Sequence, residues 1–573
     1  MLKRYIPLLE WRKTYNRHTF NSDLIAAMIV TVMLIPQSLA YALLAGLPAE
    51  VGLYASILPL IAYSIFGTSS TLSVGPVAVV SLMTAAAISS LGMLSMEQKI
   101  AAAMALAFIS GLLLLVMGLF RLGMLANFLS HPVISGFISA AGLVIAASQL
   151  PHLMGISAHG HNLFELGQSI YAQFAMINYP TLIIGVSTLA LLWWVRKSLK
   201  PLLLNLNIPD TLAGNIAKTG PVLAIILTIL VTWGFNLDAR GVAVVGDIPQ
   251  GLPDFSVPVF NSELWQQLFS SAVLISIIGF VESVSVAQTL AAKRRQRISP
   301  DQELIGLGAA NIASSVSGGF PVTGGFSRSV VNFDAGAKSP AAGAYAAMGI
   351  ALATVFLTPL IYFLPKATLA ATIIIAVLSL VDFQALKRTW QYSRGDFAAM
   401  SVTIIFTLIS GVELGILLGV GLSILLYLYR TSRPHSALVG LLEGTEHFRN
   451  IDRHQVKTCS KMLTLRIDES LYFANARYLE DRVYDLVAQH PKIEHFVLMC
   501  PAVNYIDASA LESLEAINTR LGDSGVLFHL SEVKGPVMDK LTASHFNQQL
   551  TGEVFLSQYD AWQALSNKKT TPS

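Results

Sequence analysis

The segment GGFPVTGGFSRSVVNFDAGAKSP, residues 318–340, is polar and rich in glycine, yet long apolar stretches flank it on both sides. Its first part, FPVT, is typical of a short extended piece, and it ends in Gly324 and Gly325. The residues that follow, FSRSVVNF, are compatible with a helix of about half the length needed to cross a bilayer. The segment therefore predicts a break in an otherwise apolar helical architecture.

The composition predicts a large membrane part followed by a small soluble part. Hydrophobic residues make up 54% of the 573 residues and charged residues only 12%, whereas soluble domains carry about 25% charged residues. Charge is concentrated at the end, because 30 of the 71 Asp, Glu, Lys and Arg residues lie in residues 436–573. The net charge of +3 gives no reason to expect a nucleic-acid partner. Cys459 and Cys500 lack metal-ligand spacing, so we expect free thiols and no metal site there.

Apolar runs long enough to cross a bilayer as helices need about 20 residues. Candidates of full length are 22–46, 97–120, 123–149, 178–196, 219–235, 264–291, 341–362 and 397–430. The last run is long enough for two segments joined by a tight turn near Gly411. Shorter or glycine-rich runs at 51–66, 70–92, 301–317, 322–335 and 365–381 fit backbone that lines a protein-buried cavity. The total is about 14 segments.

The distribution of basic residues predicts the orientation. They cluster between apolar runs at 293–297, 387–394 and 430–433, and the positive-inside rule makes these loops cytoplasmic. An even number of segments then places both termini in the cytoplasm. Residues 1–21 are basic and lack a signal-peptide cleavage site, so we expect a cytoplasmic amphipathic surface helix. The amphipathic stretch 162–176 is also expected to lie along a surface.

An earlier stretch, TLSVGPVAVVSLM at 71–83, has the same organisation as the opening segment, with Pro76 expected at the first helical position. Pro76 follows Gln37 of the first apolar helix by 39 residues, and Thr323 follows Glu282 of a later helix by 41. This spacing indicates two related halves. Inverted repeats whose broken helices meet at mid-membrane are typical of secondary transporters, with the substrate between the half-helix ends.

The two half-helices predict a site for a small anion. A helix N-terminus offers about four unpaired N–H donors and roughly half a positive charge, so two of them facing one another attract anions. Ser73, Thr323 and Ser327 add hydroxyl donors, and Arg328 adds a full positive charge. Arg328 could instead pair with Asp334 or cap a neighbouring helix, since charges buried in membrane proteins are usually paired.

Four motifs together resemble the signature of the SulP family of anion transporters, the bacterial relatives of the SLC26 carriers. They are IPQSLAYALLAGLPAEVGLYAS (35–56), TLSVGPVAVVSLM (71–83), FVESVSVAQ (280–288) and GGFPVTGGFSRSVVN (318–332). The resemblance implies an α-helical polytopic membrane protein with 14 segments in a 7+7 inverted repeat and a small cytoplasmic α/β domain called STAS. It also implies a homodimer in the bacterial cytoplasmic (inner) membrane, with several passes through the lipid bilayer.

The resemblance also implies site residues. By motif match, the substrate-binding residues are Gln37, Tyr41, Ser73, Val74, Gly75, Val77, Thr323, Gly324, Gly325, Phe326, Ser327 and Arg328. Glu282 matches an acidic position that serves cation coupling in some members, with a proton or with a sodium ion held near Glu282 and the Thr323 hydroxyl. Glu282 could alternatively be a structural hydrogen-bond acceptor for the nearby half-helix.

The soluble tail alternates strand and helix patterns, which predicts an α/β domain. KMLTLRI, HFVLMC and VLFHLS are typical of strands, whereas ANARYLEDRVYDLVAQH and SALESLEAINTRLG have helical periodicity. NYIDASALESL resembles the STAS loop whose serine is phosphorylated in anti-sigma-factor antagonists. Asp507 and Ser509 match that loop as regulatory candidates, although helix capping explains both residues as well.

Five regions follow from these patterns. They are an N-terminal segment (1–21), a transporter domain (22–432), a linker (433–459), the STAS domain (460–566) and a tail (567–573).

The sequence favours a transporter over an enzyme. No GxxxxGK[ST] motif occurs, the nearest string being GAKS at 336–339, and we find no nucleophile-base arrangement. We expect no cofactor, and secondary active transport of small inorganic anions, sulfate first, coupled to a proton or sodium through Glu282. The alternatives are a bicarbonate or dicarboxylate transporter, an uncoupled exchanger or channel, and a membrane sensor that signals to a cytoplasmic partner of the STAS domain.

Overall fold

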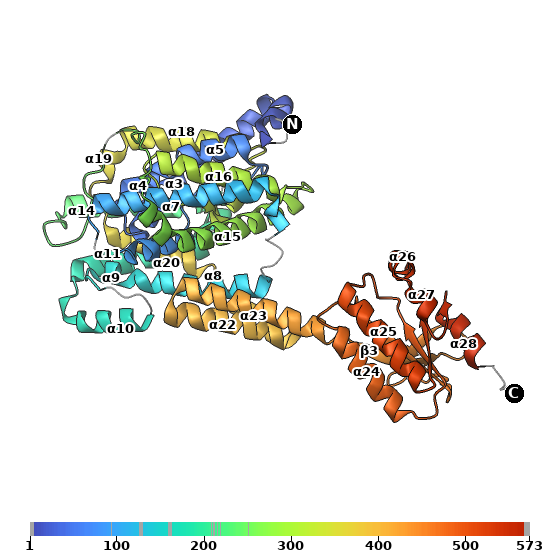
Figure 1. Ribbon diagram of the computed structural model, residues 1–573. Helices are drawn as coiled ribbons and strands as arrows, with labels where there is room; N and C mark the ends of the chain where they lie inside the picture. Colours follow the sequence, from blue (N-terminus) through green and yellow to red (C-terminus); the bar gives the residue numbers. More distant parts are fainter. Residues whose placement is uncertain are drawn as a thin grey trace, which may run out of the picture. The chain divides into compact units, whose positions relative to one another are not determined.

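The computed structural model describes residues 5–92, 94–124, 130–158, 163–207, 209, 213–214, 216–217, 219–249 and 251–566. The chain forms two compact units, Met1–Ser423 and Ile424–Ser573 (Figure 1). The first unit is helical apart from two very short strands, and the second is a sheet with helices.

The helical part repeats one order of elements twice. Its first half consists of α3 (Arg17–Leu44), α4 (Ala49–Tyr54) with α5 (Leu58–Phe66), β1 (Val74–Gly75) with α6 (Ala78–Ser89), α7 (Met96–Leu119), α8 (His131–Ser148) with α9 (Leu150–Met154), α11 (Tyr179–Trp194) with η4 (Val195–Leu199) and α12 (Lys200–Asn205), and α14 (Gly220–Gly234). Its second half consists of α15 (Ser262–Lys293), α16 (Pro300–Val316), β2 (Thr323–Gly324) with α17 (Phe326–Asp334), α18 (Ala341–Phe356) with α19 (Thr358–Ile361), α20 (Lys366–Leu378), α22 (Arg394–Ser410) and α23 (Val412–Ser432). In the described part of the chain each half thus has seven segments, as predicted.

Eight of the described helices are long enough and apolar enough to cross a membrane on their own. Shorter helices complete the unit: α2 (Leu8–Trp11), η1 (Arg12–Thr14), α10 (Leu163–Ala172), η3 (Phe174–Met176) and α21 (Phe383–Tyr392). The predicted turn at Gly411 is confirmed, because α22 ends at Ser410, Gly411 has φ +100° and α23 begins at the next residue.

Packing follows the same repeat. The helix α7 packs against α15 and α16, just as α18 packs against α3 and α5 in the other half. The pairs α8 with α22 and α11 with α20 form a second group of contacts. The helices α3 and α20 connect the two groups, since they pack against each other.

The contact between α7 and α16 depends on glycine. A methyl group at Gly111 would lie 2.9 Å from the Gly308 carbonyl oxygen, and one at Gly308 would lie 2.9 Å from the Gly111 carbonyl oxygen. Only glycine allows the two backbones to approach this closely, which is typical of membrane helix pairs. The buried Glu303 of α16 adds polar links, because its carboxylate accepts from the Tyr63 hydroxyl (2.5 Å) and the Thr68 backbone N–H (2.8 Å).

Two sequence-based boundaries need correction. We expected one surface helix over residues 1–21, but α3 already begins at Arg17, because the Asn16 side chain caps it by accepting from the Thr19 N–H (2.9 Å). The apolar run 123–149 does not form one helix, since α8 begins at His131 after Ser130 and with Pro132 in its first turn. Part of that run, residues 125–129, lies outside the described residues.

The second unit contains a six-stranded sheet with the order β4-β3-β5-β6-β7-β8. Its strands are β3 (Ser436–Leu441), β4 (Phe448–Asn450), β5 (Met462–Ile467), β6 (His495–Met499), β7 (Leu527–Ser531) and β8 (Val554–Phe555). Strands β5 to β8 pair in parallel, whereas β3 pairs antiparallel with β4 and β5. The helices are α24 (Ala476–Gln489), α25 (Ala508–Asp523), α26 (Gly535–Ala543), α27 (Phe546–Gln549) and α28 (Gln558–Ser566). The predicted α/β class is confirmed.

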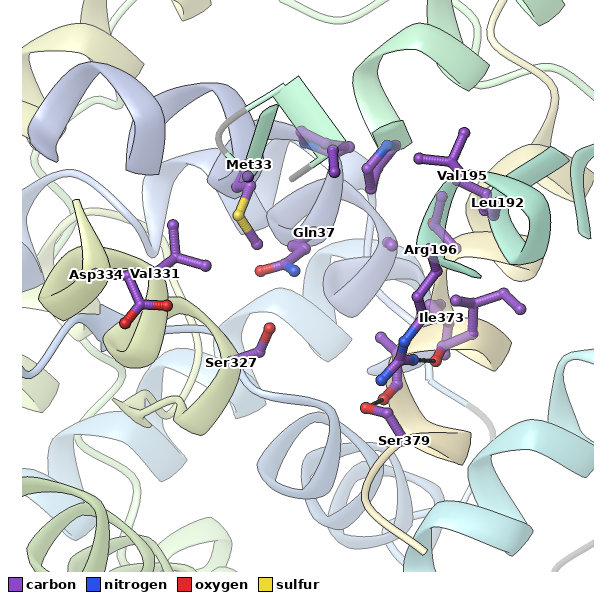
Figure 2. A pocket seen from close by; sticks show the side chains of 18 of the residues that line it. Met33, Gln37, Leu192, Val195, Arg196, Ser327, Val331, Asp334, Ile373 and Ser379 are labelled. Carbon is purple, nitrogen blue, oxygen red and sulfur yellow. Dashed lines mark hydrogen bonds between the residues drawn. The ribbon is translucent and has the colours of Figure 1, made fainter. Parts of the chain in front are cut away.

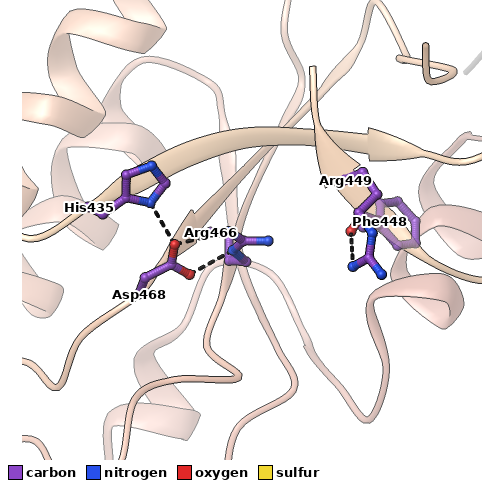
Figure 3. Close-up of polar contacts among 5 residues, drawn as sticks. All are labelled: His435, Phe448, Arg449, Arg466 and Asp468. Atoms are coloured by element: carbon purple, nitrogen blue, oxygen red, sulfur yellow. Dashed lines mark hydrogen bonds and ion pairs between the residues drawn. The ribbon is translucent and has the colours of Figure 1, made fainter. Parts of the chain in front are cut away.

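The sheet begins within the stretch 433–459, which we expected to be a linker. Both β3 and β4 fall in it, and Val439 and Phe448 are buried in a cluster with Met499 of β6. Figure 3 shows a polar network at the start of this sheet, in which Asp468 accepts from His435 (2.7 Å) and from Arg466 Nε (2.7 Å). Partial burial opposes the charged form of Asp468, but these hydrogen bonds outweigh it and hold its pKa below the ordinary value.

Both cysteines of this unit are unpaired thiols. Cys500 is buried at the end of β6, and burial raises its pKa to about 12. A thiol with such a pKa stays protonated at neutral pH and is a weak nucleophile.

Residues 433–566 should fold as a soluble unit when expressed alone, and removal of 433–459 should destabilise it. The shorter fragment 460–566 loses β3 and β4, so we expect it to be less stable by at least about 3 kcal/mol, since burying a side chain such as Phe448 or Val439 contributes roughly 1.5–3 kcal/mol. Urea unfolding of both fragments, followed by circular dichroism, measures the difference. Equal midpoints would show that β3 and β4 add nothing to this fold.

Candidate functional site

The two broken helices meet through a minimal sheet. Val74 pairs with Gly324 and Gly75 with Thr323 in antiparallel register. Directly after these strands, α6 begins at Ala78 and α17 at Phe326, and no side chain caps either helix. Pro76 precedes α6 by two residues instead of occupying its first turn, because Val77 is the N-cap. The structure therefore brings two uncapped helix N-termini together, and we call this place the junction.

Arg328 holds the junction together. Its side chain is buried and donates four hydrogen bonds to backbone carbonyls: Nε to Ser73 (2.7 Å), Nη1 to Pro76 (2.6 Å), and Nη2 to Gly75 (2.7 Å) and Thr323 (2.6 Å). These carbonyls, and not Asp334, are its hydrogen-bond partners in the described structure. The guanidinium thus connects both halves of the repeat and keeps its full charge, because carbonyl groups carry no net charge.

Two glycines, Gly75 of the first half and Gly325 of the second, make room for this guanidinium. A methyl group at Gly325 would lie 2.8 Å from Arg328 Nε, and one at Gly75 would lie 3.2 Å from Nη1. A side chain at Gly325 would therefore force Arg328 to shift, and one at Gly75 would crowd it.

The Thr323 hydroxyl attaches the junction to α15. It donates to the Gly279 carbonyl (2.6 Å) and lies 2.6 Å from the Ser283 hydroxyl, which in turn accepts from the Gly324 N–H (2.8 Å). The Ser73 backbone N–H donates to Ser329 (3.0 Å), but the buried Ser73 hydroxyl has no hydrogen-bond partner among the described residues. Burying a hydroxyl without a hydrogen-bond partner costs free energy. The Ser73 hydroxyl is therefore available to bond a ligand.

A cavity of about 850 Å³ lies beside the junction, in the helical unit. Of the residues predicted for substrate binding, Gln37, Tyr41 and Ser327 line it. The others (Ser73, Val74, Gly75, Val77, Thr323, Gly324, Gly325, Phe326 and Arg328) are not part of its lining. Figure 2 shows Ser327 and Gln37 on one side of the cavity and Arg196 on the other.

Sequence reasoning did not single out Arg196 and Lys200, which also line the cavity. Both lie at the end of an apolar run, where basic residues are usually explained by membrane orientation. No signal in the sequence separates a cation that faces a cavity from one that faces lipid headgroups.

Glu282 lies on α15 next to a small pocket of apolar side chains that includes Phe137, Ile278 and Ile416. It lies close enough to Arg328 for the two charges to interact. In the described structure no ion pair joins them, and the group of His, Cys, Asp and Glu side chains needed for a metal site is absent there.

Asp507 caps a helix in the second unit. Its carboxylate accepts from the Ala510 N–H at the start of α25 (2.9 Å) and from the Phe473 N–H (2.8 Å). Ser509 lies in the first turn of α25 and is exposed. The geometry therefore accounts for Asp507 by capping, and a regulatory role of Ser509 stays a prediction.

Apolar helices in a twofold repeat, with two broken helices meeting beside a cavity, define a membrane transporter built on discontinuous helices. Comparison with known proteins gives the family. Residues 20–403 match the sulfate permease family and residues 451–561 match the STAS domain, so the chain belongs to the sulfate permease family, which comprises transporters and not enzymes.

Relatives and solved structures agree with this assignment. Sulfate transporter 4.1, chloroplastic, of Arabidopsis thaliana is 36% identical over 89% of this chain and 75% of that protein. A probable sulfate transporter of Mycobacterium tuberculosis is 32% identical over 97% of both chains. The murine Slc26a9 anion transporter in the inward-facing state has the same fold, with a TM-score of 0.88 at 22% identity over 98% of this chain and 94% of that one. The transmembrane domain of the cyanobacterial bicarbonate transporter BicA gives 0.60 at 21% identity, over 72% of this chain and 98% of that one.

Arg328→Gln should destabilise the protein even without any anion. The substitution leaves buried carbonyls of the junction without a donor, and each such group costs roughly 1–3 kcal/mol. We therefore expect a clearly lower melting temperature of the detergent-solubilised protein in an anion-poor buffer. Arg297→Gln, at an exposed loop position, removes the same charge and should melt like the wild type. Equal melting of the two variants would contradict the role of Arg328 as the tie between the halves.

Proposed function

We propose that the protein is a secondary active transporter of small inorganic anions, sulfate first, and that the junction is its substrate site. One observation carries this proposal: two uncapped helix N-termini and a buried guanidinium bonded to carbonyls meet beside a cavity. The names of its relatives as sulfate transporters support sulfate over other anions.

An anion at the junction would meet donors of three kinds. The first turns of α6 and α17 offer backbone N–H groups and the positive ends of two helix dipoles. Ser327 offers a hydroxyl at the cavity surface, and Ser73 offers one without a partner among the described residues. Arg328 acts mainly through its charge, because four of its five N–H groups already donate to backbone carbonyls.

Protons are the better candidates for coupling than sodium ions. Sodium in such sites is coordinated by carbonyls of the unwound backbone, but Arg328 already donates to those of Ser73, Gly75 and Thr323. The Thr323 hydroxyl, predicted as a cation ligand, is bonded to Gly279 and Ser283. Glu282 itself faces apolar side chains, and such surroundings favour a neutral carboxyl group.

The interaction between Glu282 and Arg328 supplies a coupling mechanism. An ionised Glu282 offsets part of the positive potential at the junction, whereas a protonated Glu282 leaves it intact. The protonated protein should therefore bind an anion more tightly, and by linkage the bound anion favours protonation to the same extent. Proton and anion would then cross together.

Four further properties belong to the same proposal. They are a location in a bacterial cytoplasmic membrane, both termini in the cytoplasm, a homodimer, and a cytoplasmic partner for the STAS domain. The donors at the junction accept any small oxyanion, so bicarbonate and dicarboxylates are the competing substrates, and an uncoupled exchanger or channel is the competing mechanism.

The test of the function is uptake by the purified protein in liposomes. We expect concentrative uptake of radiolabelled sulfate, exceeding that of bicarbonate, succinate and chloride. Ser327→Ala should weaken sulfate affinity by about twofold to somewhat more than tenfold, the effect of one lost hydrogen bond of roughly 0.5–1.5 kcal/mol. Ser187→Ala is the control, because its hydroxyl donates within α11 to Ile184 and does not line the cavity. Preference for another anion would assign the substrate differently, and a Ser327→Ala variant with wild-type affinity would remove Ser327 from the site.

Glu282→Gln should abolish sulfate accumulation that is driven by a proton gradient and leave sulfate exchange across the membrane intact. Glutamine keeps the shape of the side chain but cannot exchange a proton, so an inward proton gradient should no longer drive sulfate accumulation, while exchange of internal for external sulfate continues. Sulfate affinity should rise on acidification in the wild type and stay constant in the variant. Glu263→Gln, at an exposed position of the same helix, is the matched control. Continued accumulation against the gradient in Glu282→Gln would leave Glu282 with a structural role.

A further inference from the structure

The buried side chain of Asn311, on α16, bonds to the backbone of one residue in both directions. Its amide oxygen accepts from the Val322 N–H (2.9 Å), and its amide nitrogen donates to the Val322 carbonyl (2.9 Å) and to the Leu307 carbonyl of its own helix (2.9 Å). The Val322 N–H can only donate, so the amide oxygen must face it. Asn311 therefore bonds to Val322 as an opposing residue does in an antiparallel strand pair.

The chain that leads into β2 is held by α16 at two points. Val322, directly before the strand, bonds to Asn311, and the Phe320 carbonyl accepts from the Ser314 hydroxyl (2.7 Å). Ser314 follows Asn311 by three residues, so both side chains lie on one face of α16. All four residues are buried, and buried backbone groups need a protein partner because the bilayer core has no water to replace it. The two side chains thus fix an extended segment that lacks helical hydrogen bonds.

The positions of both half-helices depend on this segment. The helix α17 begins after β2 with a single residue between them. In turn, α17 holds the chain before β1, because Asn332 donates to the Thr71 carbonyl (3.0 Å) and the Ser329 hydroxyl accepts from the Ser73 N–H (3.0 Å). The N-termini of α6 and α17, which form the junction, are therefore both placed relative to α16.

We infer that Asn311 and Ser314 are positioning residues for the anion site that we propose at the junction. By holding the chain before β2, they fix where the backbone N–H groups in the first turn of α17 point. Neither residue is among the described residues that line the cavity, so they act on an anion there only through the backbone. The described lining of the small pocket beside Asn311 is uncharged. The inference deepens the proposed function and rests on it.

The ordinary explanation is that Asn311 and Ser314 satisfy buried carbonyls and contribute to stability alone. A variant that is merely less stable lowers the amount of folded transporter and hence the maximal rate, whereas its folded molecules keep the wild-type KM. A variant whose junction donors have moved binds the anion less well, so its KM is raised. The KM therefore separates the two roles.

The first test measures sulfate exchange across liposomes for Asn311→Ala and Asn311→Asp, each compared with the wild type at the same pH. Asn311→Ala should raise KM about tenfold, the effect of weakening one hydrogen bond to a charged group. An ionised aspartate can accept from the Val322 N–H but cannot donate to its carbonyl, whereas a protonated one can do both. Asn311→Asp should therefore approach the wild-type KM as the pH is lowered. A wild-type KM in Asn311→Ala, or equal impairment of both variants at acidic pH, would overturn the role of Asn311.

The second test makes the same substitution at two adjacent serines. Ser314→Ala removes the bond to the Phe320 carbonyl, and we expect KM to rise about threefold, within the range for one neutral hydrogen bond. Ser315→Ala is the matched control and should keep the wild-type KM, because the buried Ser315 hydroxyl donates within α16 to the Ile312 carbonyl (2.7 Å). Equal KM values would remove Ser314 from this role. If Asn311→Ala does not fold, the two serine variants carry the test alone, and equal values then overturn the inference.

Hydrogen–deuterium exchange separates this inference from the proposed function. Peptides from residues 318–330 should incorporate deuterium faster in Asn311→Ala than in Ser315→Ala, because backbone groups there have lost their partners. If the wild type transports no sulfate and this difference is found, the proposed substrate fails while the hold of α16 on β2 stands. The KM comparison is then made with bicarbonate, succinate or chloride, whichever the wild type transports. Equal deuterium incorporation would overturn the inference even in a protein that transports sulfate.

Discussion

The hydrogen bonds of Arg328 to four backbone carbonyls are the constraint on which the helical unit depends. Gly75 lies in β1 and Thr323 in β2, and these two strands belong to opposite halves of the repeat. One guanidinium donates to the backbone carbonyls of both residues. Burying a cation is costly unless all of its donors are used, and the planar fork of arginine suits several acceptors at once better than lysine does. Glycine at 75 and 325 follows from this requirement, because any side chain there would occupy the space of the guanidinium.

The same constraint explains how the anion site that we propose at the junction would form without a free cationic side chain. The carbonyls that Arg328 engages are the groups that would otherwise present unpaired negative dipoles at the junction. With these carbonyls engaged, what remains at the surface of the junction are N–H groups and hydroxyls.

Sequence reasoning recovered the order of segments and the place where helices break, because glycine, proline and apolar length carry that information directly. The pair of half-helices was predictable from TLSVGPVAVV and PVTGGFSRSVV for this reason. The partners of Arg328 were not, since a guanidinium next to a helix start can reach a substrate, a carboxylate or a carbonyl with equal ease on the basis of spacing. Strands β3 and β4 were missed because β3 pairs with the later strand β5 and β4 pairs with β3 alone, and such pairing leaves little trace in strands of six and three residues.

The π turn η4 (Val195–Leu199), between α11 and α12, has a consequence for how the cavity wall that carries Arg196 and Lys200 responds to mutation. A π turn differs from a regular helical turn by one residue, so deletion of a single codon within it would restore an α-helix. Lys200 would then be the seventh residue after Leu192 and would keep its place on the face of the cavity, because seven residues of a regular α-helix complete nearly two turns. The π turn therefore accommodates one additional residue without changing the face that later side chains present, and an in-frame loss of one residue there, other than Arg196, would leave the basic side chains of this wall in place.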